Sequence, residues 1–227
     1  MITANCRLRM TAEDFDFVVE VLPRTEGDRV SLVSLLTDEE TRDSVLDCER
    51  LADVILDSTA PLKISPQFLF YVLCRKVLKE TPASSRPCSD YVASLLAGFL
   101  SASEAASTRG RYVCDMMEAI PKVSAREAFL LRSQIANTSL FMCGIFAENV
   151  DDRTRRKGAP DIGFYESVGR MNYRAASEYR EAKLLDLQGI YEQLAESFHE
   201  VRLALNDLAR RLLHLEAAPA VPLLCRG

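Results

Sequence analysis

The feature that most constrains this chain is an apolar repeat near its carboxyl end. Apolar side chains recur there every three or four residues, at Leu184, Leu187, Tyr191, Leu194, Phe198, Val201, Leu205, Leu208, Leu212 and Leu215. The repeat covers more than four heptads and predicts about 48 Å of helix at 1.5 Å per residue. We therefore expect one long helix from Lys183 to Glu216.

The residues beside this repeat indicate how the helix is used. Where an exposed two-stranded coiled coil would carry charges, this chain has Ile190, Ala195, Ser197, Ala204 and Ala209. A broad apolar face of this kind favours packing against several helices over pairing with a single one. Packing inside a bundle is the favoured interpretation, and a homodimer formed through the same face is the alternative.

Helix start signals occur along the rest of the chain, and the alternation typical of strands is scarce. Capping residues open apolar stretches at Thr11, Thr37, Ser65, Ser89 and Ser124, and Pro66 stands at a first helical position. The helix from Ser124 to about Val150 is apolar or small on every side in its second half, which predicts a central position. The sequence predicts an all-α fold, an irregular multi-helix bundle of about nine helices. A strand is the alternative only for residues 11–22, where acidic and apolar residues alternate.

The length of 227 residues suits one large domain or two small ones. A Ser/Ala-rich stretch over residues 101–110 separates an N-terminal helical part, residues 1–104, from a C-terminal helical part, residues 111–216. We expect the two parts to pack as one globular unit. Residues 217–227 contain two prolines and are predicted to form a flexible tail.

Composition points to a soluble cytoplasmic protein. The net charge of −5 provides no global attraction to nucleic acid or anionic lipid. Seven cysteines without regular spacing or a CxxC pair suit a reducing cytosol better than a zinc or disulfide framework. The first residues lack the apolar core of a secretory signal, and no apolar run reaches the roughly 18 residues of a membrane span.

Motifs for catalysis and for metal binding are sparse. Glu196 and His199 match the Glu-x-x-His spacing of helical di-iron sites, but Arg211 stands where a second copy, with His214, would need an acid. The apolar repeat also predicts that Glu196 and His199 lie on the outward side of their helix. His214 is expected to lie near a helix C-terminus, where a cation offsets the negative end of the helix dipole. Gly-rich phosphate loops and the GxSxG and HExxH motifs are absent from the sequence, so we predict no metal, no cofactor and no catalytic residue.

A basic cluster follows the predicted central helix, with Arg153, Arg155, Arg156 and Lys157 before Gly158 and Pro160. Cations at this position offset the helix dipole, which makes helix termination the first interpretation. The second is docking of an anionic partner, because Tyr165, Arg170, Tyr173 and Arg174 follow closely. Specific nucleic-acid binding is disfavoured by the acidic total and the small size of the cluster.

Three polar residues interrupt the apolar central helix, at Asn137, Thr138 and Ser139. They are satisfied either by the backbone or by a ligand in a pocket. The preferred hypothesis is a non-catalytic cytosolic interaction or adaptor protein with a protein partner, and with self-association through the C-terminal helix as an option. A small-ligand-binding protein or enzyme with a pocket beside residues 137–139 is the first alternative. Weak binding of nucleic acid or an anionic partner through residues 153–174 is the second.

Overall fold

The computed structural model describes residues 1–58, 60–100 and 113–217, with side chains described to residue 212 in the last helix. These residues form helices and no strand, so the predicted all-α class is confirmed. Thirteen α-helices and two short 3-10 helices occur in the described part, more than the nine predicted, because several expected helices are divided. The predicted linker over residues 101–110 and the tail from residue 218 lie outside the described residues.

The first half contains η1 (Arg7–Arg9), α1 (Ala12–Val21), α2 (Glu26–Thr37), α3 (Glu39–Leu46), α4 (Glu49–Asp57), α5 (Pro66–Leu78) and α6 (Arg86–Leu100). The second half contains α8 (Val113–Ala119), η2 (Ile120–Lys122), α9 (Ala125–Ile145), α10 (Ala147–Lys157), α11 (Ile162–Ser177), α12 (Arg180–Leu184), α13 (Gln188–Glu196) and α14 (Phe198–Ala217).

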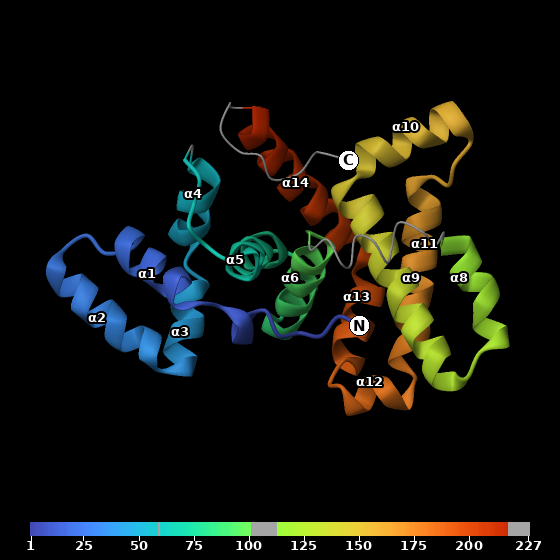
Figure 1. Cartoon of the computed structure of the whole chain (residues 1–227), viewed down its shortest axis with the longest axis horizontal. Helices are drawn as coiled ribbons and strands as arrows, with labels where there is room; N and C mark the ends of the chain where they lie inside the picture. The colour runs from blue at the N-terminus through green and yellow to red at the C-terminus, as the bar shows by residue number, and fades with distance from the viewer. Residues whose placement is uncertain (59, 101–112, 218–227) are drawn as a thin grey trace.

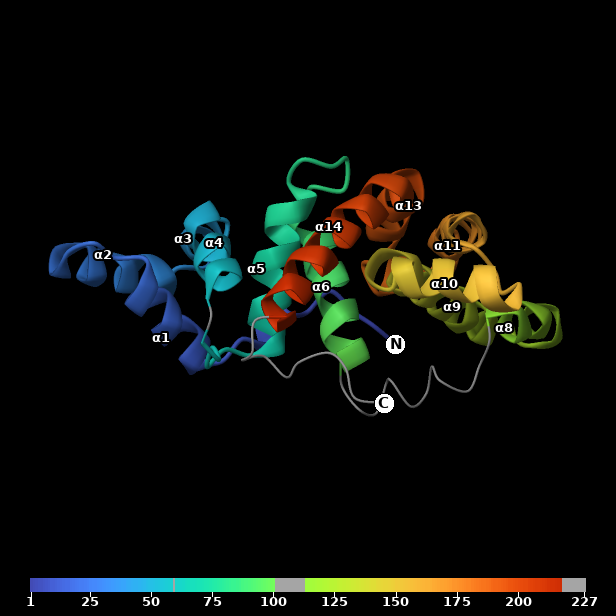
Figure 2. The same cartoon turned by 90° about the horizontal axis from the view of Figure 1, so that it is seen from above.

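The helices are arranged along an elongated molecule (Figures 1 and 2). Helices α1–α3 lie at one end, α5 and α6 in the middle, and α8, α10 and α11 at the other end. Helix α9 packs against α11, and α14 packs against both α9 and α5. A continuous apolar core runs through these contacts, from Val18 in α1 to Leu208 in α14.

Local capping explains the helix starts that the sequence predicted. Thr11 and Ser124 form capping boxes with Asp14 and Glu127, and the Ser65 hydroxyl accepts a hydrogen bond from the Phe68 N–H. Residues 12–21 are helical, so the strand alternative for this segment is wrong. Helix α6 begins at Arg86, earlier than the predicted start at Ser89, because the Ser85 hydroxyl accepts from the Cys88 N–H at 3.3 Å.

The predicted long helix over residues 183–216 is wrong as a single element. The chain divides into α12, α13 and α14, with breaks at Asp186, whose φ is 55°, and at Ser197. The breaks let α13 pack against α11 and α6 while α14 crosses α9 toward α5, which one straight rod could not do. The repeat still faces the core, since its residues from Leu187 to Leu208 are buried, whereas Leu184 is 68% exposed.

The predicted central helix is correct over α9 but not to Val150. Helix α9 ends at Ile145, and Phe146, whose N–H donates to the Met142 carbonyl, separates it from α10. Residues 38–57 divide in the same way at Asp47 and Cys48, between α3 and α4. No described helix combines the length and apolar character needed to cross a bilayer.

Candidate functional site

The Asn137 side chain lies inside a buried hydrogen-bonded network. Its Oδ1 accepts from the hydroxyls of Tyr91 in α6 and Tyr173 in α11, both at 2.8 Å. The Tyr191 hydroxyl of α13 lies 3.3 Å from that of Tyr91 and donates to Ser133 Oγ at 3.1 Å. Burial raises the pKa of all three tyrosines, so their hydroxyls stay protonated and can donate. The network joins α9 to α6, α11 and α13. The two tyrosine hydroxyls satisfy Asn137 Oδ1, so this oxygen needs no ligand as a partner.

Thr138 and Ser139 are also buried, and their hydroxyls have no hydrogen-bond partner in the described structure. Ser139 of α9 faces Gly169 of α11. A Cβ on Gly169 of α11 would lie 3.0 Å from Ser139 Cβ and 2.4 Å from Phe198 Cζ. Small residues at this crossing therefore permit close helix packing. The structure places all three predicted pocket residues in the interior between helices.

The predicted basic cluster lies on a separate helix, α10, which follows α9. Arg153, Arg155, Arg156 and Lys157 are all exposed, and Gly158 with φ 61° ends the helix. Asp152 pairs with Arg155 at 3.1 Å and with Arg156 at 3.8 Å. Cations in the last turns of α10 interact favourably with the negative end of its helix dipole, which agrees with a role in helix termination.

The aromatic and basic residues of α11 do not form one surface with this cluster. Tyr173 is fully buried, so its prediction as a surface contact is wrong. Arg170 and Arg174 are exposed, but they lie about 12 and 18 Å along α11 from its start beside α10. Tyr165 is half-buried, and burial raises its pKa although the charge of Arg153 acts in the opposite direction. Met171, between Arg170 and Asn172 on α11, is 50% exposed.

His199 takes part in a surface ion-pair group. Its Nδ1 lies 2.9 Å from Glu166 Oε1, and Arg202 Nε donates to Glu166 Oε2 at 2.9 Å. Glu196 and His199 are both exposed, as predicted, although a helix break separates them. No group of three or more potential metal-ligating side chains occurs among the described residues. The His214 side chain lies outside the described residues.

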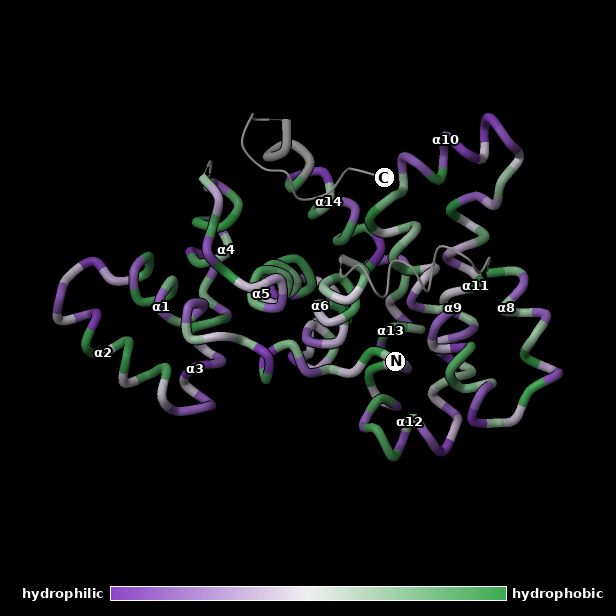
Figure 3. Tube along the Cα trace, viewed as in Figure 1, coloured by the Kyte–Doolittle hydropathy of each residue, from purple (hydrophilic) through white to green (hydrophobic). Residues whose placement is uncertain are grey.

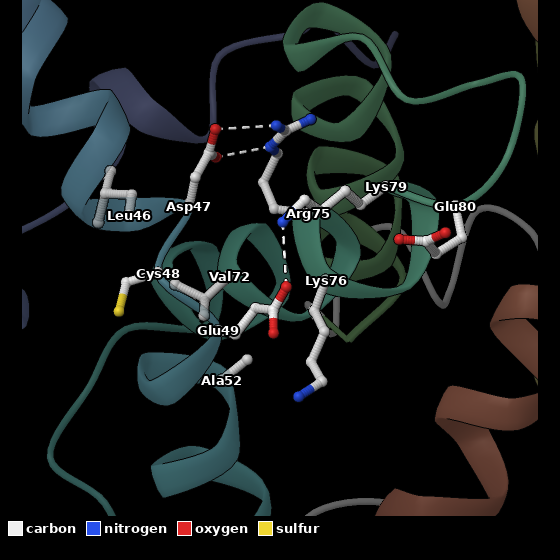
Figure 4. Close-up of a pocket in the computed structure, with 10 residues that line it drawn as sticks. All are labelled: Leu46, Asp47, Cys48, Glu49, Ala52, Val72, Arg75, Lys76, Lys79 and Glu80. Carbon is white, nitrogen blue, oxygen red and sulfur yellow. Dashed lines mark hydrogen bonds and ion pairs between the residues drawn. The ribbon is translucent and has the colours of Figure 1, made fainter.

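A pocket of about 210 Å³ lies between the α3–α4 junction and the last turns of α5 (Figure 4). Charged side chains from both sides line it and pair across it. Arg75 donates to both Asp47 carboxylate oxygens, at 2.7 and 2.9 Å, and Lys79 donates to Glu49 at 3.0 Å. Burial disfavours the ionised form of Asp47 and by itself would raise its pKa. The hydrogen bonds and positive charges of Arg75 and Arg86 outweigh this effect, so the pKa of Asp47 is lowered. The cations of the pocket are thus engaged by carboxylates of the chain.

A second charged group lies next to this pocket and fixes the N-terminal segment. Arg7 Nη1 lies 2.5 Å from Asp43 Oδ2, and the Arg7 backbone N–H donates to Asp90 Oδ1 at 3.1 Å. The Arg7 guanidinium also lies over the Tyr71 ring, 6.0 Å from its centroid. Burial raises the pKa of Asp90 in spite of the nearby Arg7 charge. These residues connect η1 to α3, α5 and α6, which is a structural role.

Helix α2 differs from the other long helices because none of its twelve residues is buried. Val30, Val33 and Leu35 are 69%, 51% and 44% exposed, and we call these three residues the α2 surface. The helix lies at the end of the molecule, with α3 and α1 as its main neighbours, and apolar positions recur along it (Figures 1 and 3). Exposed apolar side chains that gather on one element are typical of interaction surfaces.

No family model, curated protein or solved structure that we compared matches this chain.

The Asn137 network and the Arg7 group stabilise the fold, and the pocket is bridged by ion pairs. Exposed side chains that could contact a partner gather on the α2 surface and in the basic turns of α10. The basic residues of α10 were predicted from the sequence as a docking surface and the α2 surface was not, although five apolar residues from Val30 to Leu36 signal it.

Proposed function

We propose that this protein is a non-catalytic cytosolic interaction protein that docks a protein partner on the α2 surface. The observation that carries this proposal is the exposure of Val30, Val33 and Leu35 on a helix without any buried residue. Isolated exposed apolar residues are common on proteins, but Val30 and Val33 lie side by side one turn apart on α2, and Leu35 is exposed on the other side of the covered Leu32 and Leu36.

The energy available from this patch is sufficient for a docking centre. Full burial of a Val or Leu side chain is worth about 1.5–3 kcal/mol, and roughly half of each side chain is still exposed. Covering Val30 and Val33, which share one side of α2, would contribute about 2 kcal/mol. That is the scale of an interface hot spot, around which polar residues form the rim.

Site-specific photocrosslinking tests the proposal directly. A photoreactive amino acid replaces Val33 in the full chain in cells, and the matched control carries it at Leu203, which is 48% exposed on α14. We expect a discrete higher-mass adduct from position 33 and none of that mass from position 203. Identical adduct patterns at the two positions would refute docking on α2.

Self-association through the last helix is a further proposal, but it would use a different side of that helix from the apolar repeat. The repeat from Leu187 to Leu208 is covered by the chain itself, so a homodimer would use the outward side of α14, where Leu203 is exposed. Light scattering of the wild type and of Leu203→Glu tests this. A dimer that the substitution converts to a folded monomer is the supporting result, and a monomeric wild type removes the idea.

An anionic partner at α10 is the second candidate. Arg153, Arg155, Arg156 and Lys157 are exposed within five positions, which concentrates positive charge. Arg155→Gln/Arg156→Gln should weaken binding of a heparin column, whereas Arg170→Gln/Arg174→Gln removes equal charge from α11 and should change it less. Equal elution of both variants would eliminate a specific α10 site.

The small-ligand alternative is less well supported. Residues 137–139 are enclosed by helix packing, and the α3–α5 pocket of about 210 Å³ is smaller than the roughly 300–1,000 Å³ of ligand sites.

A further inference from the structure

We infer that the occupant of the α2 surface is a basic amphipathic helix of another protein. This inference rests on the proposed docking function and specifies the chemistry of the partner. It follows from the width of the apolar face of α2 and from the charge around it.

The apolar face of α2 is wider than the part that the fold covers. At 100° per residue, the arc from Leu35 through Leu32, Leu36 and Val33 to Val30 spans about 220° of the helix, and in the first turn Glu26, Asp28 and Arg29 also fall within it. Leu32 and Leu36, in the middle of the arc, pack against the core. The two flanks, Leu35 on one side and Val30 with Val33 on the other, face solvent. A single helical face therefore continues beyond its own intramolecular contact.

The shape of this flank suits a helix. Val30 and Val33 are neighbours on one side of α2, spaced three residues apart as in helix–helix packing. Helix α2 is about 18 Å long, so it offers three turns to a partner helix lying beside it. Two or three apolar residues of the partner, spaced three and four apart, would cover the flank.

The charge around the flank selects a basic partner. Residues 11–40 contain nine acidic residues, of which Asp14 is buried, and two arginines, a net charge of −7, whereas the whole chain carries −5. On this flank Glu26 lies one turn before Val30 and Arg29 lies one turn before Val33, so the excess of negative charge comes from the surrounding residues. Asp38, Glu39 and Glu40 are exposed where α2 ends and α3 begins. Lysines or arginines on the flanks of a docked helix would meet these carboxylates.

The same charge disfavours a second copy of this chain. In a two-fold dimer through α2 each patch would contact itself, which would bring two regions of net charge −7 together. Acidic helices are excluded by the same repulsion.

Three labelled peptides of about 18 residues test the inference on the full chain by fluorescence anisotropy. The first has leucine at helical i, i+3, i+4 and i+7 spacing and lysine elsewhere. The second has glutamate in place of lysine, and the third has the composition of the first without helical periodicity. We expect binding of the first peptide only, with affinity that falls at raised salt concentration.

Two pairs of variants locate the binding. Val30→Gln/Val33→Gln should weaken the first peptide about tenfold or more, and Leu203→Gln should not. Glu39→Gln/Glu40→Gln should weaken it several-fold and reduce its salt dependence, whereas Glu196→Gln/Glu200→Gln, also exposed acids, should not. Unchanged far-UV circular dichroism confirms that each variant is folded.

The outcomes separate the inference from the proposed function. Equal binding of the Leu/Lys peptide to all variants, or no binding, overturns the basic-helix inference. If Val33 crosslinks a partner in cells but the peptide fails, docking on α2 stands and the partner chemistry is wrong. If light scattering shows a dimer that Val30→Gln/Val33→Gln makes monomeric, the occupant is a second copy. If Val33 gives no adduct, the proposed function fails independently of the peptides.

Discussion

Asn137 and Thr138 are adjacent in α9, both are buried, and they should respond to substitution in opposite directions. Asn137 Oδ1 accepts two hydrogen bonds from tyrosine hydroxyls, whereas Thr138 Oγ1 has no partner in the described structure. Asn137→Ala removes the acceptor and leaves two buried donors. Thr138→Val removes a buried hydroxyl that makes no hydrogen bond and keeps the side-chain shape.

The magnitudes follow from these contacts. A buried polar group left without a partner costs about 1–3 kcal/mol, and Tyr91 keeps a weaker contact with the Tyr191 hydroxyl at 3.3 Å. Alanine recovers roughly 0.5 kcal/mol through its higher helix propensity. We expect Asn137→Ala to lower the free energy of unfolding by about 2–4 kcal/mol, which is roughly 5–15 °C in Tm for a chain of this size. Thr138→Val should be neutral or stabilise by up to about 1 kcal/mol.

Thermal and urea unfolding followed by far-UV circular dichroism measure both variants. The comparison within one helix controls for the general effect of changing a buried residue of α9. If Asn137→Ala is no more destabilising than Thr138→Val, the tyrosine network does not stabilise the fold, and the alternative of a ligand beside residues 137–139 gains support.

Three further predictions concern other parts of the fold. Gly169→Ala should lower the free energy of unfolding by about 1–3 kcal/mol because its Cβ would overlap the Phe198 ring, whereas Gly189→Ala, with no atom within 4 Å of its Cβ, should be neutral or stabilising. Urea unfolding measures both variants, and equal effects would contradict the close α9–α11 crossing. The pKa of Asp47 is lowered from 3.8, so its ion pairs stabilise the folded state above pH 3.8, and this stabilisation is lost as the pH falls through the folded-state pKa. The difference in free energy of unfolding between wild type and Asp47→Asn should therefore shrink below pH 3.8, and a difference that does not change with pH would contradict this prediction. Cys114 is exposed, whereas Cys88 is buried and burial raises its pKa to about 12. Iodoacetamide should therefore modify Cys114 long before Cys88, as measured by peptide mass spectrometry. Equal rates would show that the core around Cys88 opens readily.

The sequence predicted what local interactions determine. The caps at Thr11, Ser65 and Ser124 are formed by residues three positions apart, so their signals are complete within a short stretch. The burial of the C-terminal repeat was also predictable, because apolar spacing alone selects the buried side.

Breaks and partnerships depend on residues far away in the chain. The separation of α13 from α14 at Ser197 follows from the different neighbours of the two helices, which the continuous apolar repeat does not reveal. Asn137 was singled out as a pocket residue, but its partners Tyr91 and Tyr173 lie 46 and 36 residues away, and Tyr173 was assigned to the surface. The α2 surface was missed because its apolar residues resemble an ordinary core-facing stripe until the packing shows that only Leu32 and Leu36 are covered.

The tyrosine network also has a practical consequence for spectroscopy. The chain has no tryptophan and seven tyrosines, of which Tyr71, Tyr91, Tyr173 and Tyr191 are fully buried. Ultraviolet emission and near-ultraviolet dichroism of the native protein therefore originate largely from rings packed between α5, α6, α9, α11 and α13. Loosening of this interior can be followed optically without a label, even while the helices themselves persist.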